Sequence, residues 1–248
     1  MKALVTGASS GIGRDIAREL SKKGYDLVLV ARNTESLMNL KGELKTNVDI
    51  ITKDLSSKEN CEELYNEVGG NIEILVNNAG FGKFGEFWNT ELEKELNLID
   101  VNIKAVHILT KLFLQDMVKR NEGHILNVAS VAGFTPGPLM AAYYSSKAYV
   151  LNLSRAIKVE LKKKESNVKI SVLCPGPVRT NFNNIANVKF SIKPLSSEYV
   201  AKYTVDKLLK GKHIIIPGTL PKIMRILAKI TPTNIVMNVV YKNQTRKK

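Results

Sequence analysis

In Ala3-Leu4-Val5-Thr6-Gly7-Ala8-Ser9-Ser10-Gly11-Ile12-Gly13, an apolar run leads directly into a glycine-rich turn. This arrangement indicates the fold. A helical pattern continues from Gly13 to Lys23. Glycines permit a tight turn, and they let the backbone approach a pyrophosphate at the helix N-terminus, where unpaired N–H groups favour anions. A turn placed between a first strand and a first helix therefore predicts a dinucleotide site. Its candidate binding residues are Gly7, Ser9, Ser10, Gly11, Ile12 and Gly13.

The rest of the chain continues the alternation of short β-rich runs with stretches of helical period. The strands that we expect are residues 3–5, 27–30, 49–51, 72–76, 125–128, 168–173 and 213–216. The helical stretches between them include residues 13–23, 56–68, 91–120 and 143–164. Strand–helix–strand repetition predicts a parallel sheet, and continuous apolar runs indicate strands covered on both faces. The predicted fold class is α/β, a doubly wound Rossmann-type domain with about seven parallel strands and helices on both faces.

Length and composition fit one large globular domain. The chain has 248 residues, 44% of them apolar, and no apolar run reaches the roughly 18–20 residues of a membrane-spanning helix. We predict that residues 1–248 form a single NAD(P)-binding domain. Residues 181–197 are polar and irregular, which predicts a loop that covers the substrate. Residues 219–248 form a basic C-terminal extension.

The positive charge is concentrated in the tail. The formal net charge is +14, of which residues 201–248 carry +10 through eleven Lys or Arg and one Asp. No nucleic-acid-binding motif accompanies this charge, so we do not expect a nucleic-acid partner. Two cysteines are too few for a disulfide framework, and the chain starts at once with strand-forming residues. We expect a reducing, cytoplasmic location.

The residues after the second strand bear on the choice of cofactor. An acidic side chain there would bond the 2′-hydroxyl of an adenosine ribose, whereas a cation would accept a 2′-phosphate. Ala31 and Arg32 stand at this point, and the nearest acid, Asp26, is at the opposite end of the strand. NADP(H) is therefore favoured over NAD(H). The alternative is that Arg32 is an ordinary solvated loop cation.

Further motifs follow the later strands in a fixed order. They are Asp54 after the third strand, Asn77-Asn-Ala-Gly80 after the fourth, Asn102, Ser130 after the fifth, Tyr143-x-x-x-Lys147, and Pro175-Gly-Pro-Val-Arg-Thr180 after the sixth. With the glycine turn, this set resembles the short-chain dehydrogenase/reductase superfamily, in its common subclass of about this chain length. The resemblance covers residues 1–180.

The resemblance implies site residues as well as a fold. The family's catalytic tetrad would fall on Asn102, Ser130, Tyr143 and Lys147. Asp54 would contact the adenine, Asn78 the neighbouring ribose, and Val178 and Thr180 the nicotinamide carboxamide. The full set of implied cofactor-binding residues outside the glycine turn is Arg32, Asp54, Leu55, Asn78, Ala79, Gly80, Tyr143, Lys147, Pro175, Gly176, Val178 and Thr180.

The chemistry explains why a Tyr and a Lys stand four residues apart. Reducing a carbonyl takes a hydride and a proton, and phenol is a poor acid because its pKa is about 10. The ammonium of Lys147 would lie on the same helical face as Tyr143 and lower the pKa of that phenol. Ser130 would donate to the carbonyl oxygen, while a water held by Asn102 rests on the resemblance alone. Tyr144 is an alternative candidate for the general acid, because its spacing of three residues from Lys147 also brings those two side chains together.

The function predicted from these residues is NADPH-dependent reduction of a ketone or aldehyde, reversible as alcohol oxidation. The substrate is expected to be a small carbonyl or alcohol compound. The segments 81–87, 131–140 and 176–182 are mostly apolar, which favours a hydrophobic or mixed framework over a free sugar. The alternative is a dinucleotide-binding regulatory protein without turnover. The three histidines have no metal-ligand spacing, so no metal is expected.

The C-terminal extension departs from the family, since it lacks the glycine-rich ending common in this subclass. Residues 221–230 instead place Lys222, Arg225 and Lys229 at helical spacing beside a broad apolar side. Such a helix can lie on an anionic membrane surface. We favour the alternative that its apolar side packs on its own domain or on a partner copy. A homo-oligomer is expected from the resemblance, although the usual tetramer interface is in doubt.

Overall fold

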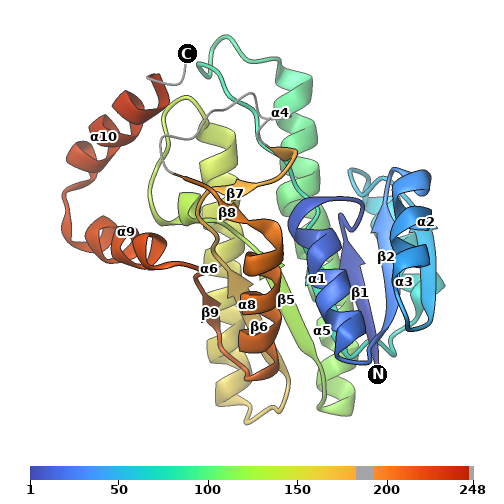
Figure 1. The fold of residues 1–248 in the computed structure, drawn as a ribbon. Coiled ribbons are helices and arrows are strands. Elements are labelled where there is room, and N and C mark those ends of the chain that lie inside the picture. The colour runs from blue at the N-terminus through green and yellow to red at the C-terminus, as the bar shows by residue number, and fades with distance from the viewer. Residues whose placement is uncertain (183–192, 246–248) are drawn as a thin grey trace.

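The computed structural model describes residues 1–182 and 193–245, and a seven-stranded parallel sheet lies at its centre (Figure 1). The strand order is β3-β2-β1-β4-β5-β6-β9. The strands are β1 (Lys2–Thr6), β2 (Asp26–Ala31), β3 (Val48–Thr52), β4 (Ile74–Asn77), β5 (His124–Val128), β6 (Lys169–Leu173) and β9 (Ile214–Ile215). They lie at the seven runs that the sequence predicts, so the predicted sheet is confirmed.

Helices cover both faces of the sheet, because successive strand residues bury their side chains on opposite sides. In β1, Val5 packs with one hydrophobic cluster and Leu4 with the other. The first cluster includes side chains of α1 (Gly11–Lys22), α2 (Thr34–Glu43) and α8 (Ser197–Leu209). The second includes side chains of α3 (Lys58–Val68), α5 (Val106–Arg120) and α6 (Ala141–Lys163). The doubly wound Rossmann-type fold is thus confirmed.

The strand order reverses at β1, which pairs with β2 on one side and with β4 on the other. In an open α/β sheet the chain connections diverge at such a point, and a crevice forms beyond the carboxyl ends of the strands. The glycine turn after β1 and the Asn77–Gly80 segment after β4 both lie at this edge. The topology therefore brings the predicted motifs together.

One predicted helical stretch is divided into three. Residues 91–120 contain α4 (Leu92–Ile99), a π-helical segment η1 (Asp100–Ala105) and α5. A π-helical turn shifts the register of the side chains that follow, and such turns are frequent at functional sites. Here the π-helical segment carries Asn102, whose side chain is fully buried.

The segment expected to be a loop is partly regular. Leu195–Ser196 form β8, which pairs in parallel with β7 (Val178–Arg179), and α8 begins at Ser197. The predicted loop boundary at residue 197 is therefore wrong, because two backbone-paired residues and a helix start lie inside it. Residues 183–192 of that prediction lie outside the described residues. A short 3-10 helix η2 (Val131–Phe134) follows β5.

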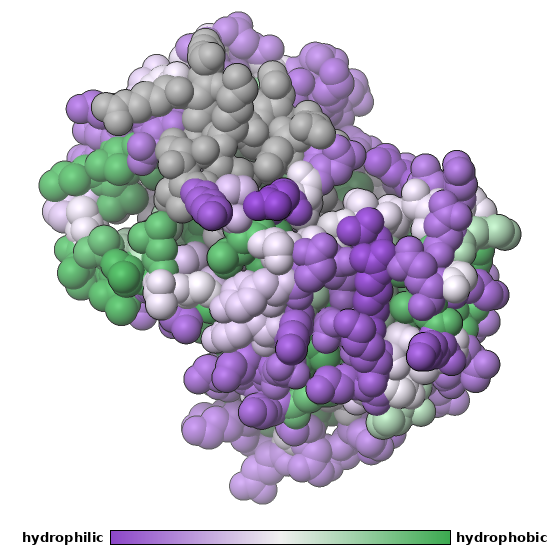
Figure 2. Space-filling view, viewed as in Figure 1, coloured by the Kyte–Doolittle hydropathy of each residue, from purple (hydrophilic) through white to green (hydrophobic). Residues whose placement is uncertain are grey.

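The C-terminal extension forms two helices, α9 (Thr219–Ile230) and α10 (Thr233–Thr245), at one side of the molecule (Figure 1). Their outer sides carry exposed apolar side chains, seen on the same side of the surface in Figure 2. Ile230 is 72% exposed and Ile226 60%. The apolar side of residues 221–230 therefore does not pack on the described part of its own domain. The other half of that expectation, packing on a partner copy, stays a prediction. Within residues 1–182 and 193–245, no helix has both the length and the apolar character needed to cross a membrane.

Candidate active site

A cavity of about 1270 Å³ opens at the carboxyl ends of the central strands. It exceeds the roughly 300–1,000 Å³ of a typical small-molecule site, so it has room for a dinucleotide and a substrate together. Of the predicted site residues, those that line the cavity are Gly7, Ser9, Ser10, Gly11, Ile12, Arg32, Asp54, Leu55, Asn78, Ala79, Gly80, Ser130, Tyr143, Lys147, Pro175, Gly176, Val178 and Thr180. Gly13 and Asn102 lie behind its wall.

The turn after β1 needs glycine at two places for two reasons. Gly11 has φ +54°, a left-handed conformation that side chains rarely adopt, and a Cβ there would lie 2.9 Å from Cγ2 of Thr180. A Cβ on Gly13 would collide with the carbonyl oxygen of Gly7 and with the amide of Asn78. The turn is therefore closed as tightly as the backbone permits.

The N-terminus of α1 points its free amides into the cavity. The N-cap residue Ser10 makes no side-chain bond to these amides, and the first turn contains no acidic residue. Unpaired N–H groups and the helix dipole attract an anion at such a terminus. The glycine turn and this helix end together fit the pyrophosphate of a dinucleotide.

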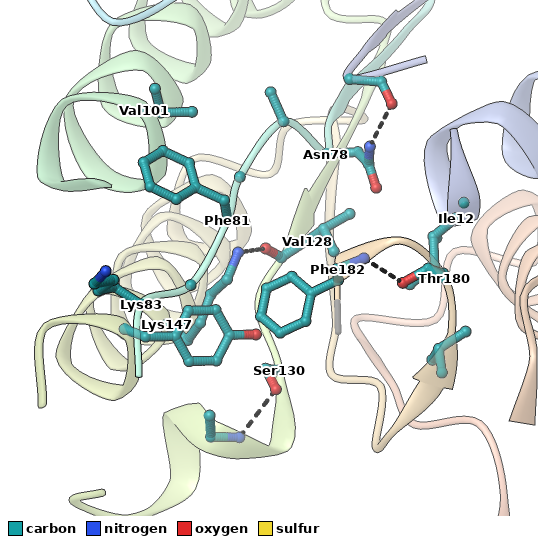
Figure 3. A pocket seen from close by; sticks show the side chains of 18 of the residues that line it. Ile12, Asn78, Phe81, Lys83, Val101, Val128, Ser130, Lys147, Thr180 and Phe182 are labelled. Carbon is teal, nitrogen blue, oxygen red and sulfur yellow. Dashed lines mark hydrogen bonds between the residues drawn. The ribbon is translucent and has the colours of Figure 1, made fainter. Parts of the chain in front are cut away.

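Asn78 holds the glycine turn in place from the neighbouring strand. Its Nδ2 donates to the carbonyl oxygens of Thr6 at 3.0 Å and of Gly7 at 3.1 Å. Its backbone N–H donates to the hydroxyl of Thr6 at 3.0 Å. Beyond the predicted ribose contact, Asn78 therefore has a structural task that sequence reasoning missed. It couples the ends of β1 and β4, as Figure 3 shows for the Asn78 amide.

The end of the cavity next to β2 carries opposite charges. Arg32 follows β2, its side chain is 70% exposed, and its Nη1 lies 3.7 Å from Oδ2 of Asp54. The other carboxylate oxygen of Asp54 accepts a bond from the N–H of Ser56 at 3.0 Å. A cation that could accept a 2′-phosphate thus stands beside a fixed carboxylate.

Three side chains with reactive groups meet at the opposite end of the cavity. The hydroxyl of Ser130 is close enough to that of Tyr143 to lower the pKa of the phenol. Lys147 Nζ lies 5.9 Å from the centre of the Tyr143 ring and donates to the carbonyl oxygen of Val128 at 2.9 Å. Figure 3 shows Lys147 and Ser130 on the same side of the cavity, across from Ile12 and Thr180. Helix α6 and the end of β5 therefore present a phenol, a hydroxyl and an ammonium to one space.

Burial controls the proton affinities of this group. It raises the pKa of Tyr143 to about 12, against a lowering by Ser130. Burial lowers the pKa of Lys147 to about 8, because an ammonium is costly away from water. The sequence predicts that Lys147 lowers the pKa of Tyr143, but desolvation dominates and its net direction is upward. Near neutral pH the phenol is thus protonated and the amine is mostly charged.

Tyr143 and Tyr144 face different surroundings. The hydroxyl of Tyr144 accepts a bond from Nε2 of Gln244 in α10 at 3.4 Å, and the ring packs on Gly137. The structure brings Tyr143, and not Tyr144, to Ser130. The geometry therefore separates the two candidates that the helical spacing left open.

Asn102 supports the wall of the cavity. Its Oδ1 accepts from the N–H of Phe81 at 3.0 Å, and its Nδ2 donates to the carbonyl of Phe81 at 2.9 Å and to Ser146 Oγ at 3.1 Å. These bonds fix the segment that follows Gly80. The side chain is fully buried, so its position fits a structural role in holding this segment. The predicted water contact stays a prediction.

Apolar side chains line the cavity next to Tyr143. Phe182 lies 5.3 Å from the Tyr143 ring, and Met140 packs in the same small cluster. The C-terminal helices add Met224, Val240 and Gln244, which sequence reasoning missed. No sequence pattern could have placed them there, because they follow Tyr143 by about 80 to 100 residues and depend on how α9 and α10 fold.

The histidines are not part of this cavity. Each has its own neighbour: His107 contacts the hydroxyl of Tyr149, His124 that of Ser171, and His213 the carbonyl of Ile170. Within the described part of the chain, no group of three or more His, Cys, Asp or Glu side chains is arranged to hold a metal ion.

Comparison with known proteins agrees with this geometry. The family model for short chain dehydrogenases matches residues 1–189. A very-long-chain 3-oxoacyl-CoA reductase of Anas platyrhynchos is 33% identical over 251 residues, which covers 97% of this chain and 78% of that protein.

Solved structures are similar over nearly the whole chain. A short-chain dehydrogenase from Sphingobium yanoikuyae in complex with NADPH has a TM-score of 0.81 at 27% identity, covering 93% of this chain and 96% of the other. A short-chain dehydrogenase/reductase from Burkholderia phymatum in complex with NAD has a TM-score of 0.83 at 26% identity, covering 96% and 94%.

Proposed function

The chain belongs to the short-chain dehydrogenase/reductase family of NAD(P)-dependent oxidoreductases that act on CH–OH groups, and from this premise we propose that it reduces a ketone or aldehyde carbonyl with NADPH. One observation carries the proposal. The glycine turn and the Ser130–Tyr143–Lys147 group face the same cavity from its two ends. The fold of residues 1–248 as one cofactor-binding domain stays a prediction.

The residues at the glycine turn fit a dinucleotide. The amides at the start of α1 would hold the pyrophosphate, Asp54 and Leu55 would contact the adenine, and Asn78 with Gly80 would lie along the ribose side. Lys147 would bond the nicotinamide ribose, and Val178 with Thr180 would hold the carboxamide. When bound, the reduced cofactor supplies the hydride.

The proton comes from the chain's own residues. The phenol of Tyr143 is held protonated by burial, which suits donation to a carbonyl oxygen as negative charge develops there. Ser130 would donate a second hydrogen bond to that oxygen. The ammonium of Lys147 stabilises the phenolate that remains. In alcohol oxidation the same groups transfer the proton in the opposite direction.

Exposure of Arg32 at the adenosine end supports NADPH as the preferred cofactor. A guanidinium forms paired, charge-assisted bonds with phosphate, whereas the nearby carboxylate of Asp54 already accepts a backbone bond. The neighbours bind NADPH in one structure and NAD in another, so the preference is a proposal for this chain.

The apolar lining supports a hydrophobic carbonyl compound as substrate. Phe182, Met140 and Met224 form this lining, and a 33% identical relative is a very-long-chain 3-oxoacyl-CoA reductase. Apolar walls bind a substrate through the area that they remove from water. We propose an aliphatic or polycyclic ketone rather than a free sugar.

A substrate panel tests the proposed function. Purified protein is assayed with NADPH and with NADH on aliphatic ketones, aldehydes, hydroxysteroids and 3-oxoacyl thioesters, and cofactor absorbance is followed. Turnover of an apolar ketone with NADPH, lost in Tyr143→Phe, is the expected result. Tight cofactor binding without turnover of any compound would favour the alternative of a dinucleotide-binding regulatory protein.

A further inference from the structure

The outer side of α9 carries a stripe of exposed apolar side chains. They recur at intervals of three and four residues, which places them on one side of a helix. Ile226 is 60% exposed and Ile230 72%. The full stripe, which we call the α9 stripe, is Leu220, Ile223, Ile226, Leu227 and Ile230.

The opposite side of α9 is already packed on the molecule. Pro221 is buried and lies against Gly176, and Arg225 and Ala228 are half-buried on the same side. The α9 stripe therefore faces away from the body. The described residues, 1–182 and 193–245, leave it uncovered.

Helix α10 repeats this arrangement. Ile235 is 55% exposed and Val239 52%, while Gln244 on the inner side is buried and donates to Tyr144. Figure 2 shows the apolar side chains gathered on the side where α9 and α10 lie. Contiguous exposed apolar surface of this kind marks an interaction site.

The charges beside the stripe are all positive. The exposed cations of these two helices are Lys222, Lys229 and Lys242, and the sequence contains no Asp or Glu after Asp206. In the described residues, none of these three cations forms an ion pair with a carboxylate. This surface is therefore complementary to a partner that is apolar and negatively charged.

We propose that the outer sides of α9 and α10 bind the surface of an anionic lipid bilayer. The apolar stripe would enter the boundary between headgroups and acyl chains, and the cations would meet the anionic headgroups. A second copy of the chain fits less well, because a two-fold contact would bring the acid-free helices of both copies together. This inference goes beyond the proposed reaction and does not depend on it.

Co-sedimentation with vesicles tests the proposal. The full chain is mixed with vesicles of phosphatidylglycerol and phosphatidylcholine, or of phosphatidylcholine alone, and the pelleted fraction gives a partition coefficient. We expect binding to the anionic vesicles that weakens at about 1 M salt, where the Debye length falls to about 3 Å. The double variant Ile226→Asp/Ile230→Asp should lower the partition coefficient by at least about 30-fold.

A matched variant controls for the added charge. Met38→Asp/Val159→Asp introduces two acids at similarly exposed apolar positions, 60% and 58%, on α2 and α6. It should lower the partition coefficient by less than one quarter of the fold-change that Ile226→Asp/Ile230→Asp causes. Unchanged reductase activity or cofactor binding in both double variants shows that they fold, because none of the four residues lines the cavity.

Three results would overturn the proposal. The first is failure of the full chain to pellet with anionic vesicles. The second is an equal loss of binding in both double variants. The third is a stable dimer, seen by analytical ultracentrifugation without lipid, that Ile226→Asp/Ile230→Asp dissociates, since this would assign the surface to a second copy.

Discussion

Lys147 should make the protein less stable while making it active. Its side chain is 5% exposed, and its Nζ has one bond, to the carbonyl oxygen of Val128 at 2.9 Å. Burial lowers the pKa of its ammonium from 10.5 to about 8. At about 1.4 kcal/mol for each tenfold change in proton affinity, keeping the charge at pH 7 costs about 3 kcal/mol of stability.

The variant Lys147→Met removes this cost and keeps most of the side-chain volume. The carbonyl of Val128 loses its donor, which costs about 1 kcal/mol, so the net gain is about 2 kcal/mol. For a chain of this size we expect the melting temperature at pH 7 to rise by roughly 4–8 °C. Turnover should be lost, because the phenolate of Tyr143 loses its neighbouring charge.

The pH dependence of stability independently checks the sign of the stability change predicted for Lys147→Met. An unfolded Lys keeps its proton up to a pKa of about 10.4, whereas the folded protein releases it near 8. The unfolded state binds more protons between these values, so the stability of the wild type rises with pH there. The advantage of Lys147→Met is therefore full at pH 7 and shrinks as pH rises from 8 to 10.

Thermal melts followed by circular dichroism, without added cofactor, measure this difference. Lys162→Met is the control, because Lys162 is an exposed residue of the same helix. It should change the melting temperature by less than about 2 °C. A less stable Lys147→Met at pH 7, or an advantage that does not change between pH 7 and 10, would refute the reasoning.

Three further predictions concern the cavity. Tyr143→Phe should lower kcat by about 10²–10⁴-fold in the NADPH absorbance assay, whereas Tyr144→Phe keeps most of it; the reverse result would exchange their roles. Gly13→Ala should weaken NADPH binding at least tenfold in a fluorescence titration, because its Cβ opens the turn, and Gly42→Ala, in open space, should not. Arg32→Asp should shift the ratio of kcat/KM for NADPH over NADH by about 10–100-fold toward NADH, and an unchanged ratio would make Arg32 a surface cation.

Several features that local patterns left open depend on how distant segments of the chain pack together. Tyr143 and Tyr144 have equivalent spacing to Lys147, and only the packing of η2, β5 and α10 places one at Ser130 and the other at Gln244. The direction of the pKa shift of Tyr143 also depends on packing, because desolvation outweighs the lowering by Ser130. Spacing in the sequence indicates which charged side chain is near the phenol, but it does not indicate how far folding removes the phenol from water.

The strands, the order of the motifs along the chain and the glycine turn could all be predicted from the amino-acid sequence. These follow from local physics: apolar runs form buried strands, and Gly11 is required by a left-handed backbone. The sequence also set the apolar stripe of α9 through helical period. Whether that stripe is covered, and whether Val240 reaches the cavity, depends on contacts between segments far apart in the chain. Only the folded molecule decides those, because burial is a property of the whole packing.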